Sequence, residues 1–281
     1  MLTVFFVLTY ALTWTLFILV AVAVPLRTSL GGAMALLGAF APAIVAISLT
    51  WRAGGTPAVR ALLSRILIVD VPVRLYVLAV TFMAGVKLAA AALHRVIDGT
   101  WPRFGTEPLW LLPLAVAVSA PFQAGEEIGW RGFALPRLAQ RFGLRGASVV
   151  LGAIWALWHL PKFYIADADA YHQSFAVYAA QVIAMSVALA WIYYRSGGSL
   201  LLAMLMHSAV NNTKDIVPSV ATATVPPGVF SLNASMVSWL TLSILWVAAA
   251  YFLRRMPAGN PLGSTALKET VDADRTTVLG P

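Results

Sequence analysis

Long apolar runs separated by short polar segments dominate this chain of 281 residues. About 20 apolar residues, rising 1.5 Å each in a helix, cross a hydrocarbon core roughly 30 Å thick. The pattern therefore predicts an all-α, polytopic membrane protein with about eight transmembrane helices. The expected ranges are Leu2 to Val24, Leu30 to Trp51, Leu75 to Leu93, Leu109 to about Gly132, Ala147 to about Leu160, Phe175 to Tyr194, Ser199 to about Asn211, and Ser235 to Leu253.

The fourth, fifth and seventh of these runs differ from the others because they are short or carry polar residues. Polar and charged side chains inside a membrane helix are costly, so they usually face protein or a water-filled cavity. We therefore expect helices four, five and seven to enclose a site.

Composition agrees with a membrane protein and narrows the chemistry. The chain is 60% hydrophobic and 11% charged, whereas about 25% charged residues are usual in soluble domains. It contains no cysteine, which excludes disulfides, thiolate metal sites and thiol nucleophiles. The net charge of +8 comes from basic residues beside apolar runs, a pattern that orients a protein in a membrane. The expected partner is thus membrane lipid, and no nucleic acid.

The distribution of charge also predicts the orientation. A cytoplasmic N-terminus puts 13 of the 19 basic residues on the cytoplasmic side, so we expect both termini there and the protein in a bacterial inner membrane. Residues 1–256 are predicted to form one transmembrane domain, with its motifs at about residues 108–213. The tail, residues 257–281, is predicted to be disordered and cytoplasmic. Residues 57–69 have the pattern of an amphipathic surface helix.

Several polar residues stand out within the three unusual runs. Glu126, Glu127 and Arg131 form an EExxxR string in the fourth run, and two of the four histidines fall in or beside the fifth and seventh, His159 and His207. Such a string alone is more often a solvated ion pair, and a lone buried histidine is more often a core residue. Three runs that each contribute such residues argue for a shared site instead.

Three sequence blocks, GEEIGWRGFALPRL, IWALWHLP and LLLAMLMHSAVNNT, closely resemble the signature blocks of the CPBP family of intramembrane proteases. This is the CAAX prenyl endopeptidase and bacteriocin-processing group, also called Abi. Its pattern is EExxxR, then an aromatic residue and a histidine separated by three positions, then HxxxN. The resemblance covers about residues 108–213. It departs from the pattern at Trp155, where phenylalanine is more usual, and we expect this ring to pack.

The resemblance implies an intramembrane endopeptidase and a role for each motif residue. Glu126 would activate water together with His159, since a buried carboxylate beside an imidazole suits a general base. The oxyanion would be stabilised by His207 and Asn211, which lie one turn apart on one helix face. Supporting roles fall to Glu127, Arg131, Trp155 and Asn212. The substrate would be a membrane-associated peptide or protein, either lipidated or a bacteriocin-type precursor.

Other readings of the same residues stay open. Glu126, His159 and His207 would also make a zinc site with the fourth position left to water, although the sequence has no HExxH; no other cofactor is expected. Two non-enzymatic alternatives are a membrane scaffold and a proton-coupled transporter, since intramembrane Glu and His also mark ion pathways. The absence of repeated halves argues against a transporter.

Straight helices would not bring the expected catalytic pair together. Counted from the two ends of their runs, Glu126 and His159 would lie about 15 Å apart in depth. We therefore expect the fourth helix to bend at Pro113 or Pro121 and to continue past Arg131. We also expect substrates to reach the site from the cytoplasmic side.

Overall fold

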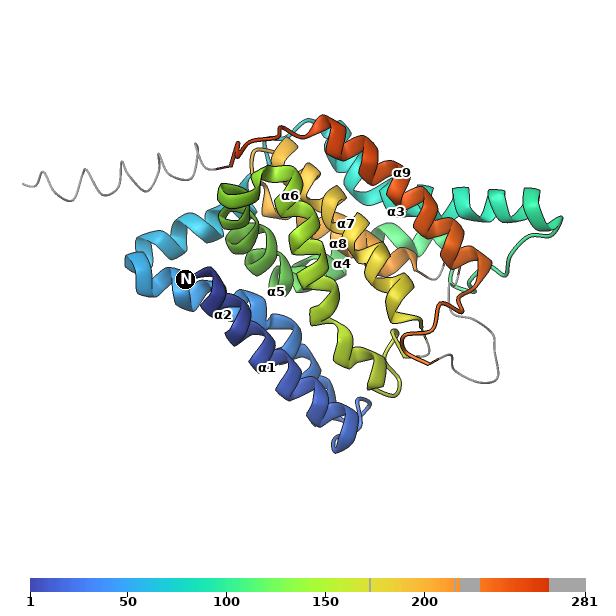
Figure 1. Cartoon of the computed structure of the whole chain (residues 1–281), viewed down its shortest axis with the longest axis horizontal. Coiled ribbons are helices and arrows are strands. Elements are labelled where there is room, and N and C mark those ends of the chain that lie inside the picture. The colour runs from blue at the N-terminus through green and yellow to red at the C-terminus, as the bar shows by residue number, and fades with distance from the viewer. Residues whose placement is uncertain (172, 215, 218–227, 263–281) are drawn as a thin grey trace, which may run out of the picture.

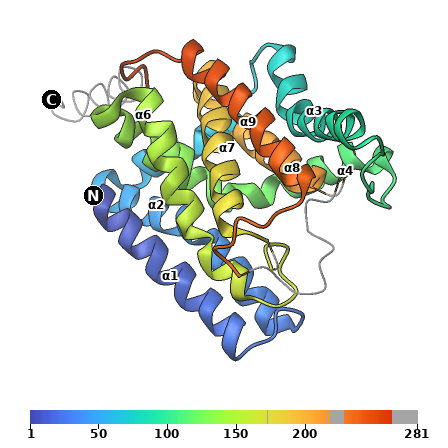
Figure 2. The same cartoon turned by 45° about the vertical axis from the view of Figure 1, so that its right-hand side comes forward.

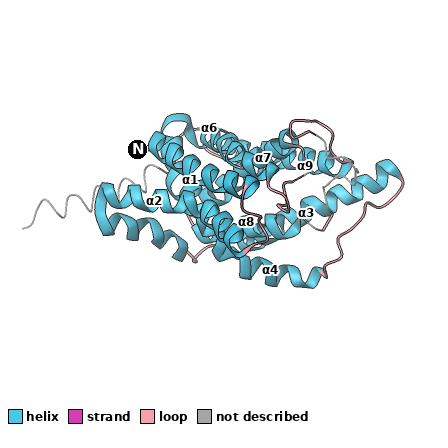
Figure 3. Cartoon of the chain, turned by 90° about the horizontal axis from the view of Figure 1, so that it is seen from below, coloured by secondary structure: helices cyan, strands magenta, loops and turns pink. Residues whose placement is uncertain are grey.

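Helices form all the regular secondary structure in the described part of the chain, which agrees with the all-α prediction (Figure 1, Figure 3). The computed structural model describes residues 1–171, 173–214, 216–217 and 228–262. The α-helices are α1 Leu2–Val22, α2 Ser29–Leu63, α3 Val73–Asp98, α4 Leu112–Ser119, α5 Ala124–Glu127, α6 Leu135–Trp158, α7 Phe175–Arg195, α8 Leu200–Thr213 and α9 Met236–Arg255. The 3-10 segments are η1 Ser64–Leu67, η2 Leu109–Leu111, η3 Ala120–Gln123 and η5 Leu160–Tyr164, and η4 Ile128–Ala134 is a π-helix.

Six helical stretches among the described residues are long and apolar enough to cross a membrane, and the protein is an integral membrane protein. The predicted count of eight is not confirmed. The expected fourth and fifth spans fall within one stretch, Leu109–Tyr164. The expected seventh span corresponds to α8, which has only 14 residues.

The stretch Leu109–Tyr164 consists of several short helices joined end to end. The helix type changes at η3, which contains Pro121, and helix continues past Arg131 to the region of Gly143. The bend expected at Pro113 or Pro121 stays a prediction, because the residues flanking η3 keep right-handed helical φ and ψ. At Gly143 the backbone has φ 63° and ψ 171°, a left-handed φ that suits glycine and divides α6 into two arms. Figure 2 shows α4 lying across the bundle, whereas the second arm of α6 runs alongside α7.

α6 packs mainly against α7 and also contacts α1. In both views α6 lies between α1 and α7, and α1 packs along α2 (Figure 1, Figure 2). Buried aromatic rings from α1, η4 and α6 fill the space between them. Phe5 contacts Trp130 and Phe133, with ring centroids 5.7 and 4.9 Å apart, and Trp130 contacts Trp158 at 5.6 Å. This apolar packing fixes η4 against the second arm of α6.

The first turn of α8 is held by a side chain that the sequence places just before it. The Ser199 hydroxyl accepts a hydrogen bond from the backbone N–H of Leu202 and donates one to the carbonyl of Ile68, at 3.3 and 2.7 Å. A serine N-cap of this kind satisfies a free N–H at the helix start. It also ties α8 to the segment after η1, which sets the position of the residues further along α8.

Two peripheral predictions concern a surface helix and the tail. α2 leaves helical geometry at Gly54 and Gly55, so the residues predicted as a surface helix do begin after a break in the span. Residues 257–262, the start of the predicted tail, are described, and the Gly259 carbonyl accepts a hydrogen bond from the Leu144 N–H at 2.9 Å. Residues 263–281 lie outside the described residues, so their disorder stays a prediction.

Candidate active site

The two adjacent glutamates of α5 are both buried but have different partners. Glu126 Oε2 accepts a hydrogen bond of 2.6 Å from the indole N–H of Trp155 on α6. Glu127 Oε1 instead accepts from Arg131 on η4 and from His207 Nδ1 on α8, each at 2.8 Å. Successive residues of a helix point about 100° apart, which is why neighbours contact different elements. One glutamate therefore faces α6, and the other links η4 to α8.

His159 follows the last residue of α6 and is oriented by its own helix. Its Nδ1 donates to the backbone carbonyl of Trp155 at 2.8 Å. Because a carbonyl can only accept, this contact places a proton on Nδ1 and leaves Nε2 as the second nitrogen of the ring. The ring also packs edge-to-face against Trp158 and Tyr178, with centroids 4.7 and 5.5 Å away. Its orientation is thus fixed on three sides.

The ion pair of Glu127 and Arg131 is fully buried, since both side chains are 0% exposed. The guanidinium carbon also lies 4.4 Å from the centre of the Trp155 ring, a cation–π contact. Within the described residues, Arg131 Nε and Nη2 and Glu127 Oε2 have no hydrogen-bond partner. A buried charge needs compensation, so this pair, together with His207, forms the polar centre that joins η4 and α8.

Asn211 lies one turn after His207 but has a different environment. Its side chain is exposed, and Nδ2 donates to Gln123 Oε1 at 3.2 Å. Gln123 is a buried residue of η3 that the sequence analysis missed. The sequence could have indicated Gln123, because it is a polar residue in an apolar run, three positions before Glu126.

Asn212, expected to support the site, packs elements together. Its Nδ2 donates to Ser119 Oγ at 2.6 Å and to the Ser208 carbonyl at 2.8 Å. These bonds connect the end of α4 to α8. Asn212 therefore fixes the position of α8 and has no direct contact with Glu126 or the histidines among the hydrogen bonds of the described residues.

All the expected motif residues gather around α5, the second arm of α6 and α8, the elements in place of predicted helices four, five and seven. Glu126 interacts electrostatically with His207, His159 and Lys162. Among the described residues its hydrogen bonds reach one carboxylate oxygen, Oε2, and the residue keeps 8% of its surface exposed. The other oxygen, Oε1, is thus free to accept a hydrogen bond from water.

A small charged cluster lies just beyond His159. Lys162 is on η5, and Lys214 pairs with Asp169 at 2.9 Å. Partial burial alone would raise the pKa of the Asp169 carboxyl, but Lys162 and Lys214 outweigh burial and lower that pKa to about 2. Asp169 therefore stays negatively charged at neutral pH, and this end of the site carries fixed charges of both signs.

The described residues do not offer a ready zinc site. They contain no group of three or more His, Asp or Glu side chains arranged to hold a metal ion. Of the three expected ligands, His207 pairs with Glu127 rather than Glu126, and Glu126 bonds to Trp155. The zinc alternative is therefore not favoured by this arrangement, and it stays a prediction for metal analysis.

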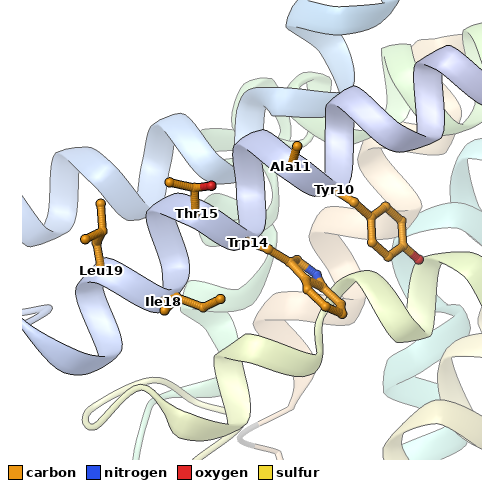
Figure 4. Close-up of a pocket in the computed structure, with 6 residues that line it drawn as sticks. All are labelled: Tyr10, Ala11, Trp14, Thr15, Ile18 and Leu19. Carbon is orange, nitrogen blue, oxygen red and sulfur yellow. The ribbon is translucent and has the colours of Figure 1, made fainter.

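A hollow of about 490 Å³ on α1 is separate from this polar cluster. Figure 4 shows the six residues that line it, all from one helix. Two of them, Tyr10 and Trp14, donate hydrogen bonds to the carbonyls of Ile154 and Trp158. The hollow contains no acid or histidine, so it offers no group for hydrolysis.

The lengths of α6 and α7 locate the site relative to the arginine-rich ends of these two helices. Fifteen helical residues, Leu144 to Trp158, separate the Gly143 turn from His159, which is about 22 Å at 1.5 Å per residue. Along α7, Tyr178 beside His159 and Arg195 are about 26 Å apart by the same rule. The site is therefore far from the arginine-rich end of both helices. Access to the site from the cytoplasmic side stays a prediction.

Comparisons with known proteins cover the same region. Residues 106–213 match the family described as type II CAAX prenyl endopeptidase Rce1-like. CAAX prenyl protease 2 of Methanococcus maripaludis is 28% identical over 98 residues, which make up 33% of this chain and 36% of that protein. The chain thus matches only about a third of the length of this curated relative. The family match includes every motif residue from Glu126 to Asn211.

Proposed function

From the Rce1-like family to which residues 106–213 belong, we infer that the protein is an intramembrane endopeptidase. The observation that carries this proposal is the placement of Glu126. It lies among buried elements with one carboxylate oxygen bound by Trp155, and it interacts electrostatically with His159 and His207. A buried carboxylate with one oxygen held by an indole and the other free to bind water, with two imidazoles on neighbouring elements, suits hydrolysis by an activated water.

In this mechanism Glu126 is the general base. Its free oxygen takes a proton from water while the water oxygen bonds to the scissile carbonyl carbon, and the electrons of the C=O bond move onto the carbonyl oxygen. The C–N bond then breaks as the carbonyl re-forms, and the proton held by Glu126 passes to the leaving amine. Positioned acid–base groups typically contribute about 10²- to 10⁴-fold in rate.

The two histidines take different parts in this scheme. His159 donates from Nδ1 to the Trp155 carbonyl, so its Nε2 is available to hold the attacking water. His207 uses Nδ1 for Glu127, which leaves Nε2 as the ring nitrogen that can face the substrate. From there His207 would donate to the oxyanion, with Asn211 as a second donor one turn away. One such donor is typically worth about 2.7 to 4 kcal/mol.

Substrates are peptides or proteins associated with the membrane, because the candidate site is built from membrane-spanning stretches. A lipidated substrate and a bacteriocin-type precursor both fit this class. The scaffold and transporter alternatives lack a comparable observation, since neither requires a carboxylate with one oxygen fixed and the other free.

A trapping experiment tests the proposal. We would purify the natural protein and the Glu126→Gln variant from the same membranes, sequence the peptides that remain bound, and then incubate these peptides with the natural protein. We expect peptides to accumulate on the variant and the natural protein to cut them at one bond. Glu107→Gln, which removes an exposed carboxylate, is the matched control and should retain nothing extra.

Removal of metal ions distinguishes hydrolysis by glutamate-activated water from zinc-dependent hydrolysis. Extensive chelation, followed by measurement of bound zinc and of peptide cleavage, should leave the cleavage rate unchanged. Loss of cleavage that zinc restores would favour the zinc alternative. If the natural protein cuts none of the trapped peptides, the endopeptidase proposal is wrong.

A further inference from the structure

Trp155 contacts four residues of the candidate site. Its indole N–H donates to Glu126 Oε2 at 2.6 Å, and its backbone carbonyl accepts from His159 Nδ1 at 2.8 Å. Its ring lies 5.2 Å from the His207 ring and 4.4 Å from the Arg131 guanidinium carbon. Trp155 therefore contacts Glu126 and His159 as well as Arg131 and His207, the two residues that pair with Glu127.

We propose that Trp155 is a positioning residue for Glu126, an inference that rests on the proposed function. Its indole N–H holds one carboxylate oxygen and turns the other toward water and substrate. Sequence resemblance assigned this position to a packing ring, where phenylalanine is more usual. A phenylalanine has no N–H, so in this chain Trp155 adds a contact that packing alone does not supply.

The direction of this hydrogen bond is unambiguous. An indole nitrogen can only donate and a carboxylate oxygen can only accept. Bonds to an ionised acceptor are shorter and roughly twice as strong as those between neutral groups, which agrees with the 2.6 Å distance. Trp155 is also buried, so water does not compete for its N–H. The bond therefore restricts rotation of the Glu126 carboxylate.

The same residue also sets the geometry between base and imidazole. Trp155 and His159 lie four positions apart, and His159 is fixed to the carbonyl of Trp155. Glu126 comes from a different element, α5, and reaches α6 through the indole. Trp155 thus ties the base on one element to the histidine on the other, so that a single water can lie between them.

The first test compares two tryptophans whose indoles both donate a hydrogen bond. Trp155→Phe removes the donor but keeps an aromatic ring, and Trp14→Phe is the matched control. Trp14 on α1 donates an indole bond 3.1 Å long to the backbone carbonyl of Trp158. We expect Trp155→Phe to lower kcat by roughly 10- to 100-fold, because a small misplacement of reacting groups has effects of that order. KM should change less than about twofold, since the binding surface stays in place.

The control separates positioning from stability. Trp14→Phe should also lower the unfolding temperature, because it removes a hydrogen bond between α1 and α6, yet keep kcat within about threefold of the natural value. A Trp155→Phe protein with natural kcat overturns the proposal. So does an equal loss of kcat in both variants, because that result indicates a structural role for the indole bonds.

A spectroscopic test does not depend on peptidase activity. With ¹⁵N-labelled tryptophan, the indole resonance of Trp155 is identified as the one that disappears in Trp155→Phe, or by selective labelling if that variant does not fold. We expect Glu126→Gln to move this resonance upfield by more than any other indole resonance, because an amide is a weaker acceptor than a carboxylate. An unmoved resonance overturns the proposed bond. A moved resonance in a protein that cuts no peptide rejects the proposed function and keeps the contact.

Discussion

At the scale of single residues, neighbouring identical side chains have separate roles. The sequence presents Glu126 and Glu127 as one motif, but Glu126 bonds to Trp155, and Glu127 bonds to Arg131 and His207. The motif residues themselves could be predicted, because polar groups within apolar runs have few explanations other than a site. Their partners could not, since partners depend on how α5, α6 and α8 are rotated against one another.

The buried pair of Glu127 and Arg131 gives a prediction at this scale. Arg131→Leu leaves a fully buried carboxylate with His207 as its remaining partner, so we expect the free energy of unfolding to fall by about 3 to 5 kcal/mol. Arg27→Leu is the control, because Arg27 pairs with Asp167 while 81% exposed. Exposed pairs contribute less than about 1 kcal/mol.

Denaturant unfolding of the purified variants in one detergent measures both changes. Similar, small losses for the two variants would show that the buried pair does not stabilise the fold. Loss confined to Arg131→Leu is the expected result.

At the scale of elements, hydrophobic runs predicted the helices well but did not predict where one helix ends and the next begins. The expected fourth and fifth spans were separated by polar residues, yet one helical stretch contains both and is broken by a kink at Gly143. The π-helix Ile128–Ala134 follows directly after the two glutamates. Such insertions change the rotation of the residues after them, and an apolar pattern in a membrane helix does not reveal them because most positions are apolar on every side.

Gly129 gives the prediction for elements. A Cβ at this position would lie 2.5 Å from Pro42 Cβ and 2.6 Å from its carbonyl carbon, so α2 and η4 must separate to accept one. We expect Gly129→Ala to lower the unfolding temperature and, because Glu126 is three residues away, peptidase activity as well.

Gly85→Ala is the matched control, since an added Cβ there meets nothing within 4 Å. In a helix interior this change should be neutral or stabilise by roughly 0.5–1 kcal/mol. Thermal unfolding of both variants measures these changes. An unchanged unfolding temperature for Gly129→Ala would mean that the close contact of α2 and η4 does not stabilise the fold.

At the scale of the whole molecule, the site lies toward one end of the bundle. The Gly143 turn and Arg195 mark the arginine-rich end, whereas His159 and Lys162 lie near the opposite end of α6. The charge distribution along the sequence indicates an orientation, but the depth of the site depends on where α6 begins and ends. For that reason residue counts along straight helices do not place Glu126 and His159 at one depth.

Labelling from the two sides of the membrane tests this placement. The chain has no cysteine, so Lys162→Cys, Arg145→Cys and Asn211→Cys each carry a single thiol. We expect an impermeant thiol reagent to reach Asn211→Cys from the same side as Lys162→Cys, because the exposed Asn211 follows His207 toward that end. Arg145→Cys should react from the other side. Labelling of Asn211→Cys from the side that labels Arg145→Cys would contradict the placement.

The ratio of kcat for the natural protein and Glu126→Gln on one cleaved peptide tests whether Glu126 activates the water that hydrolyses the peptide bond. Thermal unfolding of both proteins verifies that they are folded. We expect a ratio of at least about 100, because a general base is lost. A folded Glu126→Gln protein that cleaves the peptide at the natural rate would contradict this role of Glu126.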